Sequence, residues 1–175
     1  QSPKEAIDYG IALLPEDRKQ QGALLDIDVK GNISMAILEK ISSYSVVDQK
    51  QEKEISSDYR KKINIKTPSL EQKVKNLSGG NQQKVVIAKW LAVNPDLIIL
   101  DEPTRGIDVG AKFEIYKLIN QLVAEGKTII LISSEMEELI GMSDRIMVLA
   151  EGEITGMLEK EEFSQERILD YASKT

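Results

Sequence analysis

The stretch "NLSGGNQQKVVIAKWL", residues 76–91, joins a serine and two glycines to the start of an amphipathic helix. Glycine lets a backbone come close to a ligand, and the first N–H groups of a helix favour a bound anion. We therefore expect a helix from Ser78 to about Val93 that presents Ser78, Gly79 and Gly80 to a phosphate. Taken alone, Ser-Gly-Gly is better explained as an ordinary helix start or a linker.

A second stretch, "LIILDEPT" at residues 97–104, is typical of a buried strand that ends in two carboxylates. In open α/β sheets, ligands bind at the carboxyl ends of the strands. Successive strand residues point to opposite faces, so Asp101 and Glu102 can have different roles. Asp101 would support Mg²⁺ directly or through water, and Glu102 would orient or deprotonate an attacking water. The alternative is that two acidic residues simply end a strand before a proline turn.

Composition limits the class of protein. The chain has 175 residues, 41% of them hydrophobic and 30% charged, which is typical of one soluble globular domain. Its net charge of −6 gives no basic surface for nucleic acid. It has no cysteine for a disulfide and no apolar run of the ~18 residues that cross a bilayer. The first residues contain neither a Met nor a signal-peptide pattern, so we interpret the chain as a piece of something longer.

Short, nearly all-apolar runs predict strands that are buried on both faces of a parallel sheet. They occupy residues 10–14, 97–100, 128–133 and 145–150. Between the second and third, a helix is expected to begin at the N-cap Asp108 and to end at Gly126, giving a right-handed strand–helix–strand crossover.

The remaining segments lack the pattern of buried parallel strands. Residues 29–77 predict a small helical insert, in which Ile55, Tyr59 and Ile63 form a narrow apolar stripe. Gly152 suggests a hairpin near the C-terminus, and residues 165–171 suggest a short helix.

No phosphate loop of the form G-x-x-x-x-G-K-[ST] occurs in the sequence. The nearest match is "GKT" at residues 126–128, but Gln121 stands where the first glycine is needed. The order of elements is also inverted, because this segment runs from a helix into a strand. Gly126 is therefore expected to end a helix, with Lys127 complementing the helix dipole.

"LSGGNQQK" followed by "LIILDEPT", with Asp101 23 positions after Ser78, resembles the ABC ATPase family, with its signature, helix and Walker B strand. The resemblance implies an α/β fold: a partial P-loop NTPase (RecA-like) parallel-sheet core with an inserted ABC-type helical subdomain. The implied parts are a core remnant at 1–28, the helical subdomain at 29–93, the core with Walker B at 94–158 and a helical tail at 159–175. The family's N-terminal part, with the phosphate loop, is missing.

Three further segments resemble the same family. "PTRGID" at residues 103–108 resembles its D-loop, which would include Gly106 and Asp108. "LLPEDRK" at residues 13–19 resembles its Q-loop, with Glu16 where a glutamine is usual. Ser134 stands at the position of the family's switch histidine, and the chain has no histidine at all.

A finer resemblance is to the second, C-terminal ATPase half of bacterial monosaccharide importers of the ribose, galactose and xylose type. It rests on "PEDRKQQG", "LSGGNQQK", "DEPTRGIDVGAK" and "SSEM". It implies ATP and Mg²⁺ as ligands, and a partner ATPase half, membrane permease subunits and an external sugar-binding protein as partners. It also implies a place at the cytoplasmic face of the membrane and sugar-translocating ATPase activity that the isolated chain lacks.

The resemblance divides the site residues between two ATP sites. Ser78, Gly79, Gly80 and Gln82 would meet ATP held by the partner half. The site of this half would use Asp101, Glu102, Glu16 and Ser134, and we expect it to be weak because the histidine is replaced. Three alternatives remain: a DNA-repair type ABC protein, disfavoured by the short insert; a non-catalytic regulatory module; and an ABC ATPase for another substrate, including a soluble translation-type protein.

Overall fold

The computed structural model describes residues 2–173. Their contacts divide the chain into two compact units, one ending at Ile130 and one beginning at Leu131. This boundary lies inside a strand, at residues 128–132. The two units are described separately below.

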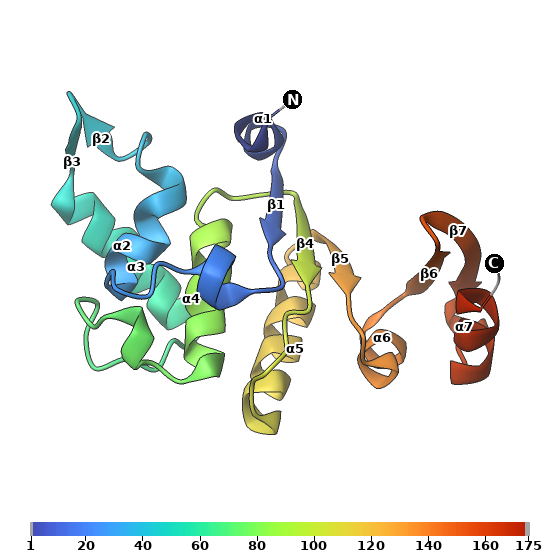
Figure 1. The fold of residues 1–175 in the computed structure, drawn as a ribbon. Coiled ribbons are helices and arrows are strands. Elements are labelled where there is room, and N and C mark those ends of the chain that lie inside the picture. The colour runs from blue at the N-terminus through green and yellow to red at the C-terminus, as the bar shows by residue number, and fades with distance from the viewer. Residues whose placement is uncertain (1, 174–175) are drawn as a thin grey trace. The chain divides into compact units, whose positions relative to one another are not determined.

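The first unit contains a sheet with the strand order β1-β4-β5 (Figure 1). The strands are β1 (Ile11–Leu14), β4 (Leu97–Asp101) and β5 (Thr128–Ile132). β1 and β4 run parallel, with Ile11 opposite Leu97 and Leu14 opposite Leu100. The strands predicted at residues 10–14, 97–100 and 128–133, and a parallel core sheet, are therefore confirmed.

Only one face of this sheet is buried within the first unit. Leu14 and Leu100 are 1% and 2% exposed, whereas Leu13 and Ile130, on the other face, are 48% and 44% exposed. The expectation that both faces are buried is wrong for the described chain. Strand alternation places every second side chain on the uncovered face, so an apolar run alone does not show how many faces are covered.

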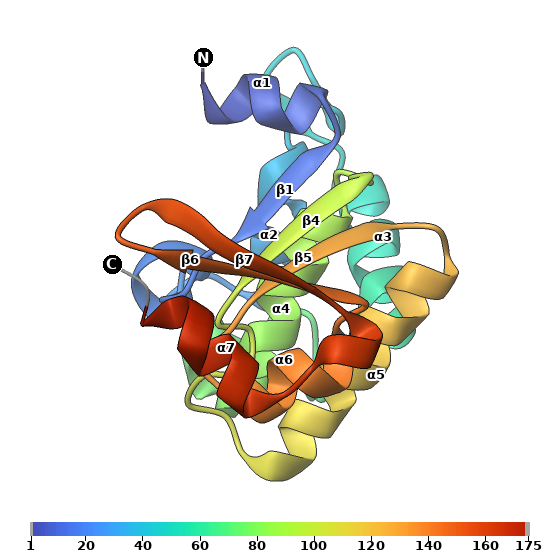
Figure 2. The same cartoon turned by 90° about the vertical axis from the view of Figure 1, so that its right-hand side faces the viewer.

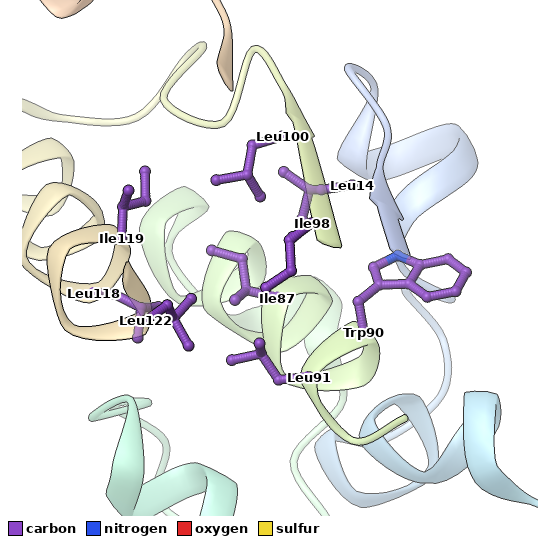
Figure 3. Close-up of a pocket in the computed structure, with 9 residues that line it drawn as sticks. All are labelled: Leu14, Ile87, Trp90, Leu91, Ile98, Leu100, Leu118, Ile119 and Leu122. Atoms are coloured by element: carbon purple, nitrogen blue, oxygen red, sulfur yellow. The ribbon is translucent and has the colours of Figure 1, made fainter. Parts of the chain in front are cut away.

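Two helices cover the buried face: α4 (Gly79–Leu91) and α5 (Val109–Ala124). Figure 3 shows a small cavity between these helices and the sheet. Its lining side chains are Leu14, Ile87, Trp90, Leu91, Ile98, Leu100, Leu118, Ile119 and Leu122. These side chains belong to the apolar core of the unit, and a lining of this kind does not suit a phosphate.

The ends of α5 follow the sequence prediction. At the first end, the Asp108 carboxylate accepts a hydrogen bond of 2.9 Å from the Ala111 N–H. At the other end, Gly126 has a φ of +88°, and its N–H donates to the Val123 carbonyl at 2.9 Å. The "GKT" segment is therefore a helix end followed by β5, as expected.

The segment expected to be a helical insert, residues 29–93, is mainly helical and also carries a short hairpin that the sequence did not predict. Its elements are α2 (Val29–Ser34), η2 (Met35–Ile37), β2 (Ser42–Ser43), β3 (Val46–Val47), α3 (Gln49–Lys62) and η3 (Val74–Asn76), followed by α4. Two further elements precede the insert: α1 (Pro3–Asp8) before β1 and the π-helical turn η1 (Arg18–Gly22) after it.

The buried face of α3 is more polar than its apolar stripe suggests. Glu52 is 8% exposed and Ser56 is fully buried. The Glu52 carboxylate accepts a 2.7 Å hydrogen bond from the Ser34 hydroxyl and lies 3.0 Å from the Lys30 ammonium. Paired polar groups can be buried at modest cost, so hydrophobic spacing identified the helix but only part of its inner face.

The second unit is built around an antiparallel hairpin, β6 (Arg145–Ala150) and β7 (Glu153–Glu159) (Figure 2). Its turn contains Glu151 and Gly152, both with positive φ, as in a type I′ turn. The helices of this unit are α6 (Met136–Met142), η4 (Lys160–Glu162) and α7 (Gln165–Ala172). The hairpin and the C-terminal helix are as predicted, but the strand at residues 145–150, expected in the parallel sheet, pairs antiparallel with β7. Among the residues described, no helix is long and apolar enough to span a membrane.

Candidate functional site

The start of α4 holds Ser78 in an exposed position with an organised hydroxyl group. The side chain of Ser78 does not cap the helix. Its Oγ accepts a 2.9 Å hydrogen bond from Asn81 Nδ2, and Asn81 Oδ1 accepts one of 2.7 Å from the Lys66 N–H. Because the oxygen is already an acceptor, the hydroxyl proton can be donated to a ligand. The first-turn N–H groups of α4 favour the same kind of ligand, an anion.

A side chain would clash at Gly80 and would be tightly placed at Gly79. A Cβ atom on Gly80 would be 2.5 Å from the Ala111 Cβ, at the start of α5. A Cβ atom on Gly79 would be 3.0 Å from Arg18 Nη2 and 3.4 Å from the Gly106 carbonyl oxygen. Glycine at these positions therefore brings the beginning of α4 against two neighbouring segments.

Gln82, predicted to meet the ATP of the partner half, has its side chain in the interior. It is 7% exposed, and its Nε2 donates to the Val74 carbonyl at 3.2 Å. Asn81 is the side chain that lies beside Ser78. The sequence offered a sign of this contact, because asparagine follows the serine at i, i+3, where helical side chains are neighbours.

The two carboxylates after β4 differ in backbone conformation. The strand ends at Asp101, and Glu102 has a φ of +47°. Both residues are half-buried. The simple alternation of strand faces therefore does not extend to Glu102, which corrects the geometric reason given above for their separate roles. A left-handed non-glycine residue is uncommon, and such residues are concentrated at functional sites.

The donor set near Asp101 suits Mg²⁺ only in part. Among residues 2–173, no group of three or more acidic side chains could hold a metal ion. Magnesium in phosphate-binding sites takes one or two protein carboxylates and fills its remaining positions with water and phosphate oxygens. Asp101 fits that pattern as a single ligand, direct or through water.

The segments with Glu16 and Gly106 lie together. The Glu16 carboxylate forms an ion pair with the Arg105 guanidinium, and both groups are exposed. Arg18 donates from Nη1 to the Arg105 carbonyl at 2.7 Å and from Nη2 to the Gly106 carbonyl at 3.2 Å. The negative charge of Glu16 is therefore balanced within the chain. Sequence reasoning identified Glu16, Gly106 and Asp108 but missed both arginines.

Ser134 lies in the loop between β5 and α6 and is exposed. It belongs to the second unit, whereas Asp101, Glu102 and Glu16 belong to the first. The role given to Ser134 rests on its sequence position.

An ion pair between a buried lysine of α4 and a half-exposed glutamate of α5 joins the two helices. Lys84 is 2% exposed, and its Nζ lies 2.7 Å from Glu114 Oε2 and 2.9 Å from the Asn64 carbonyl oxygen. Lys66 Nζ lies 3.1 Å from the other Glu114 oxygen. The hydrogen bonds from Lys84 and Lys66 lower the pKa of Glu114 below its usual value of 4.5. Since Lys66 also holds Asn81, this network reaches Ser78.

Comparison with solved structures defines the class of fold. The chain superposes over its whole length on 73% of a nucleotide-free ATP-binding cassette from an ABC transporter, with a TM-score of 0.81 at 20% identity. Over 93% of its length it also matches the ATP-binding cassette MJ0796, solved as a dimer in a post-hydrolysis state with ADP and Pi, with a TM-score of 0.75 at 21% identity. The fold is thus the predicted one, a partial RecA-like cassette.

The ABC transporter family model matches residues 9–105, more than half of the chain. This chain therefore belongs to the ABC transporter family.

Curated relatives show which members of the family this chain is similar to. The chain is 53% identical over 172 residues to the ribose import ATP-binding protein RbsA of Clostridium tetani. It is 51% identical to the xylose import ATP-binding protein XylG of Geobacillus kaustophilus and 54% identical to the L-arabinose transport ATP-binding protein AraG of Geobacillus stearothermophilus, each over 171 residues. These alignments take in 98% of the chain but only 33–34% of each relative. The chain spans about a third of the length of the curated relatives it matches.

Proposed function

We propose that this chain is part of the ATPase of a carbohydrate ABC importer. Support comes from the identity of at least half of the aligned residues to proteins named for ribose, xylose and L-arabinose import. In this proposal the chain works within a larger protein that binds ATP and Mg²⁺ at the cytoplasmic face of the membrane. Its partners are a second ATPase half, permease subunits and, through them, a sugar-binding protein.

The observation that carries the proposal is the arrangement of Ser78. The hydroxyl is exposed, its oxygen accepts from Asn81, and it stands at the N-terminus of a helix without capping it. An exposed donor at such a helix end suits an anion that comes from outside the unit. The ligand proposed is the triphosphate of ATP held by the partner half.

The physical contribution of this end of α4 is electrostatic. Gly79 and Gly80 allow the backbone to approach the phosphates. A charge at a helix N-terminus is favoured by ~0.3–1 kcal/mol at an exposed site, and by more when water is excluded. ATP then joins the two halves, and its hydrolysis removes the contacts that favour the joined state.

The site at the end of β4 is proposed to be the weaker of the two. Asp101 would take part in holding Mg²⁺ and Glu102 would orient water. Ser134 is shorter than histidine and carries no charge. Losing one preorganised stabilising group lowers the rate by ~10²–10³. Most turnover is therefore assigned to the ATP site that Ser78 completes.

The first test is Ser78→Arg in the full-length protein, with ATPase activity as the readout. A bulky cation in place of the hydroxyl should abolish most activity. The matched control is Ser43→Arg, on the exposed strand β2 of the same unit, which should keep wild-type turnover. Unchanged activity in Ser78→Arg would refute the proposal and favour a non-catalytic module.

The second test concerns the weak site alone. Glu102→Gln removes the carboxylate and keeps the size of the side chain. If the site at β4 is weak, this variant retains most of the ATPase activity. Near-complete loss of turnover would show that the site at β4 is not weak, and the role of Ser78 would then rest on the Ser78→Arg result alone.

A further inference from the structure

The π-helical turn η1 is held firmly on α4. Gly22 is buried, and a Cβ atom there would lie 3.2 Å from both methyl groups of Val86. The Lys89 ammonium donates a hydrogen bond to the Gly22 carbonyl. Asp17 caps the start of the turn by accepting from the Lys19 N–H at 2.8 Å. Because π-helical turns are rare and often lie at functional sites, we asked what this one positions.

Arg18 extends from this turn to two other segments. Its two terminal nitrogens donate to consecutive carbonyls, those of Arg105 and Gly106, at 2.7 and 3.2 Å. One of these nitrogens also lies 3.0 Å from where a Cβ of Gly79 would be. Its Nε is buried and makes no hydrogen bond. An unpaired buried donor is costly, so stability alone does not explain this placement.

We propose that Arg18 is a positioning residue, which fixes the loop at Arg105 and Gly106 against the signature glycine Gly79. The planar guanidinium can donate to both carbonyls at once from one fixed geometry. Glu16, two residues earlier, pairs with the Arg105 side chain, so the two segments are joined twice. This inference rests on the proposed function, in which Glu16 serves one ATP site and Gly79 the other.

The consequence is a link between the two ATP sites within one unit. A movement of the segment at residues 16–18 would move the loop at 105–106 and change how Gly79 and Ser78 meet the ATP of the partner half. The role of Arg18 is therefore expected in turnover more than in stability, since exposed ion pairs such as Glu16–Arg105 stabilise a fold little.

The experiment is Arg18→Ala in the full-length protein, measured as ATPase activity at saturating ATP. We expect a loss of about tenfold, in the range that small misplacements of binding groups produce. Lys19→Ala is the matched control, because it removes a neighbouring cation from the same turn and should keep wild-type turnover. The melting temperature of Arg18→Ala should stay close to that of Lys19→Ala. A loss of activity explained by unfolding at the assay temperature would overturn the proposal.

A double-mutant cycle with Ser78→Ala separates positioning from a structural role. If Arg18 acts through the signature, the double variant loses less activity than the product of the two single losses. Fully multiplicative losses would overturn the proposal. The outcomes also separate the two hypotheses: an inactive Ser78→Arg with an unaffected Arg18→Ala refutes only the role of Arg18. An unaffected Ser78→Arg refutes the proposed function itself.

Discussion

The start of α4 and the end of β4 are two phosphate-related regions of one unit, and they are built differently. At the start of α4, Ser78 is held by Asn81, and Gly80 lies against Ala111 of α5. At the end of β4, the chain passes from Asp101 into the left-handed residue Glu102. The first region is organised by packing between segments, and the second by a local backbone conformation.

This difference teaches which region is more complete in the described chain. Every segment that positions Ser78 lies before residue 131, in the first unit. Ser134, which was assigned to the site at Glu102 from its sequence position alone, is in the second unit. Substitutions at the two regions should therefore affect stability for different reasons. At the start of α4, an added side-chain atom should disturb the packing. At Glu102, the effect should depend on how easily the new residue adopts a left-handed backbone.

Gly80→Ala should have the largest effect on stability. The new methyl group would overlap the Ala111 Cβ, at a separation of 2.5 Å, and overpacking of this kind costs about 2 kcal/mol. The free energy of unfolding of the chain, measured by urea denaturation, should fall by that amount even though alanine favours helices.

Two controls make this prediction specific. Gly141→Ala, in α6, meets nothing within 4 Å and should not destabilise the chain. Ala111→Gly removes the opposing Cβ atom, so it should restore most of the stability of Gly80→Ala. A Gly80→Ala protein as stable as the parent would mean that α4 and α5 do not approach closely here, and the contrast between the two regions would be lost.

Much of the fold could be predicted from sequence, because strands and caps leave local patterns. The apolar runs predicted as strands at residues 10–14 and 97–100 form the parallel pair β1 and β4, and Asp108 and Gly126 lie at the ends of α5. The insert was recognised as helical, but the buried Glu52 was missed because its partners come from α2.

The residues of the candidate site could largely be predicted from the sequence, but the contacts between them could not. Ser78 and Glu102 were found from motifs. Arg18 was missed because its partners are main-chain carbonyls 87 and 88 residues away, and no local pattern marks such a contact. Gln82 was chosen over Asn81, although the helix turns the first inward and leaves the second beside Ser78.

Glu114→Gln tests whether charge also holds α4 to α5. The change leaves the buried ammonium of Lys84 with a neutral partner, and we expect a loss of about 1.5 kcal/mol at pH 7. The folded-state pKa of Glu114 lies below 4.5, so its contribution is present above that pH and is lost as pH falls through the lowered value. The stability difference between parent and variant, followed by urea denaturation, should therefore be smaller below pH 4.5 than at pH 7.

The matched control is Glu54→Gln, on the exposed side of α3, which should change stability little at either pH. A difference for Glu114→Gln that stays constant with pH would show that lost packing, and not charge, accounts for the effect. The start of α4 would then depend on close contact alone.

Glu102 offers the finest test of the comparison, because only its backbone is unusual. We compare Glu102→Gly with Glu102→Ala, since both remove the carboxylate and every contact it makes. At a φ of +47°, the glycine variant should be the more stable by about 1 kcal/mol, because a Cβ atom is strained in the left-handed region. At Asn120, exposed in the helix α5, the order should reverse, because alanine is favoured over glycine in a helix by about 1 kcal/mol. Equal stabilities of the two Glu102 variants would show that the conformation costs nothing. In that case, the left-handed conformation would no longer support a functional role for the carboxylate at position 102.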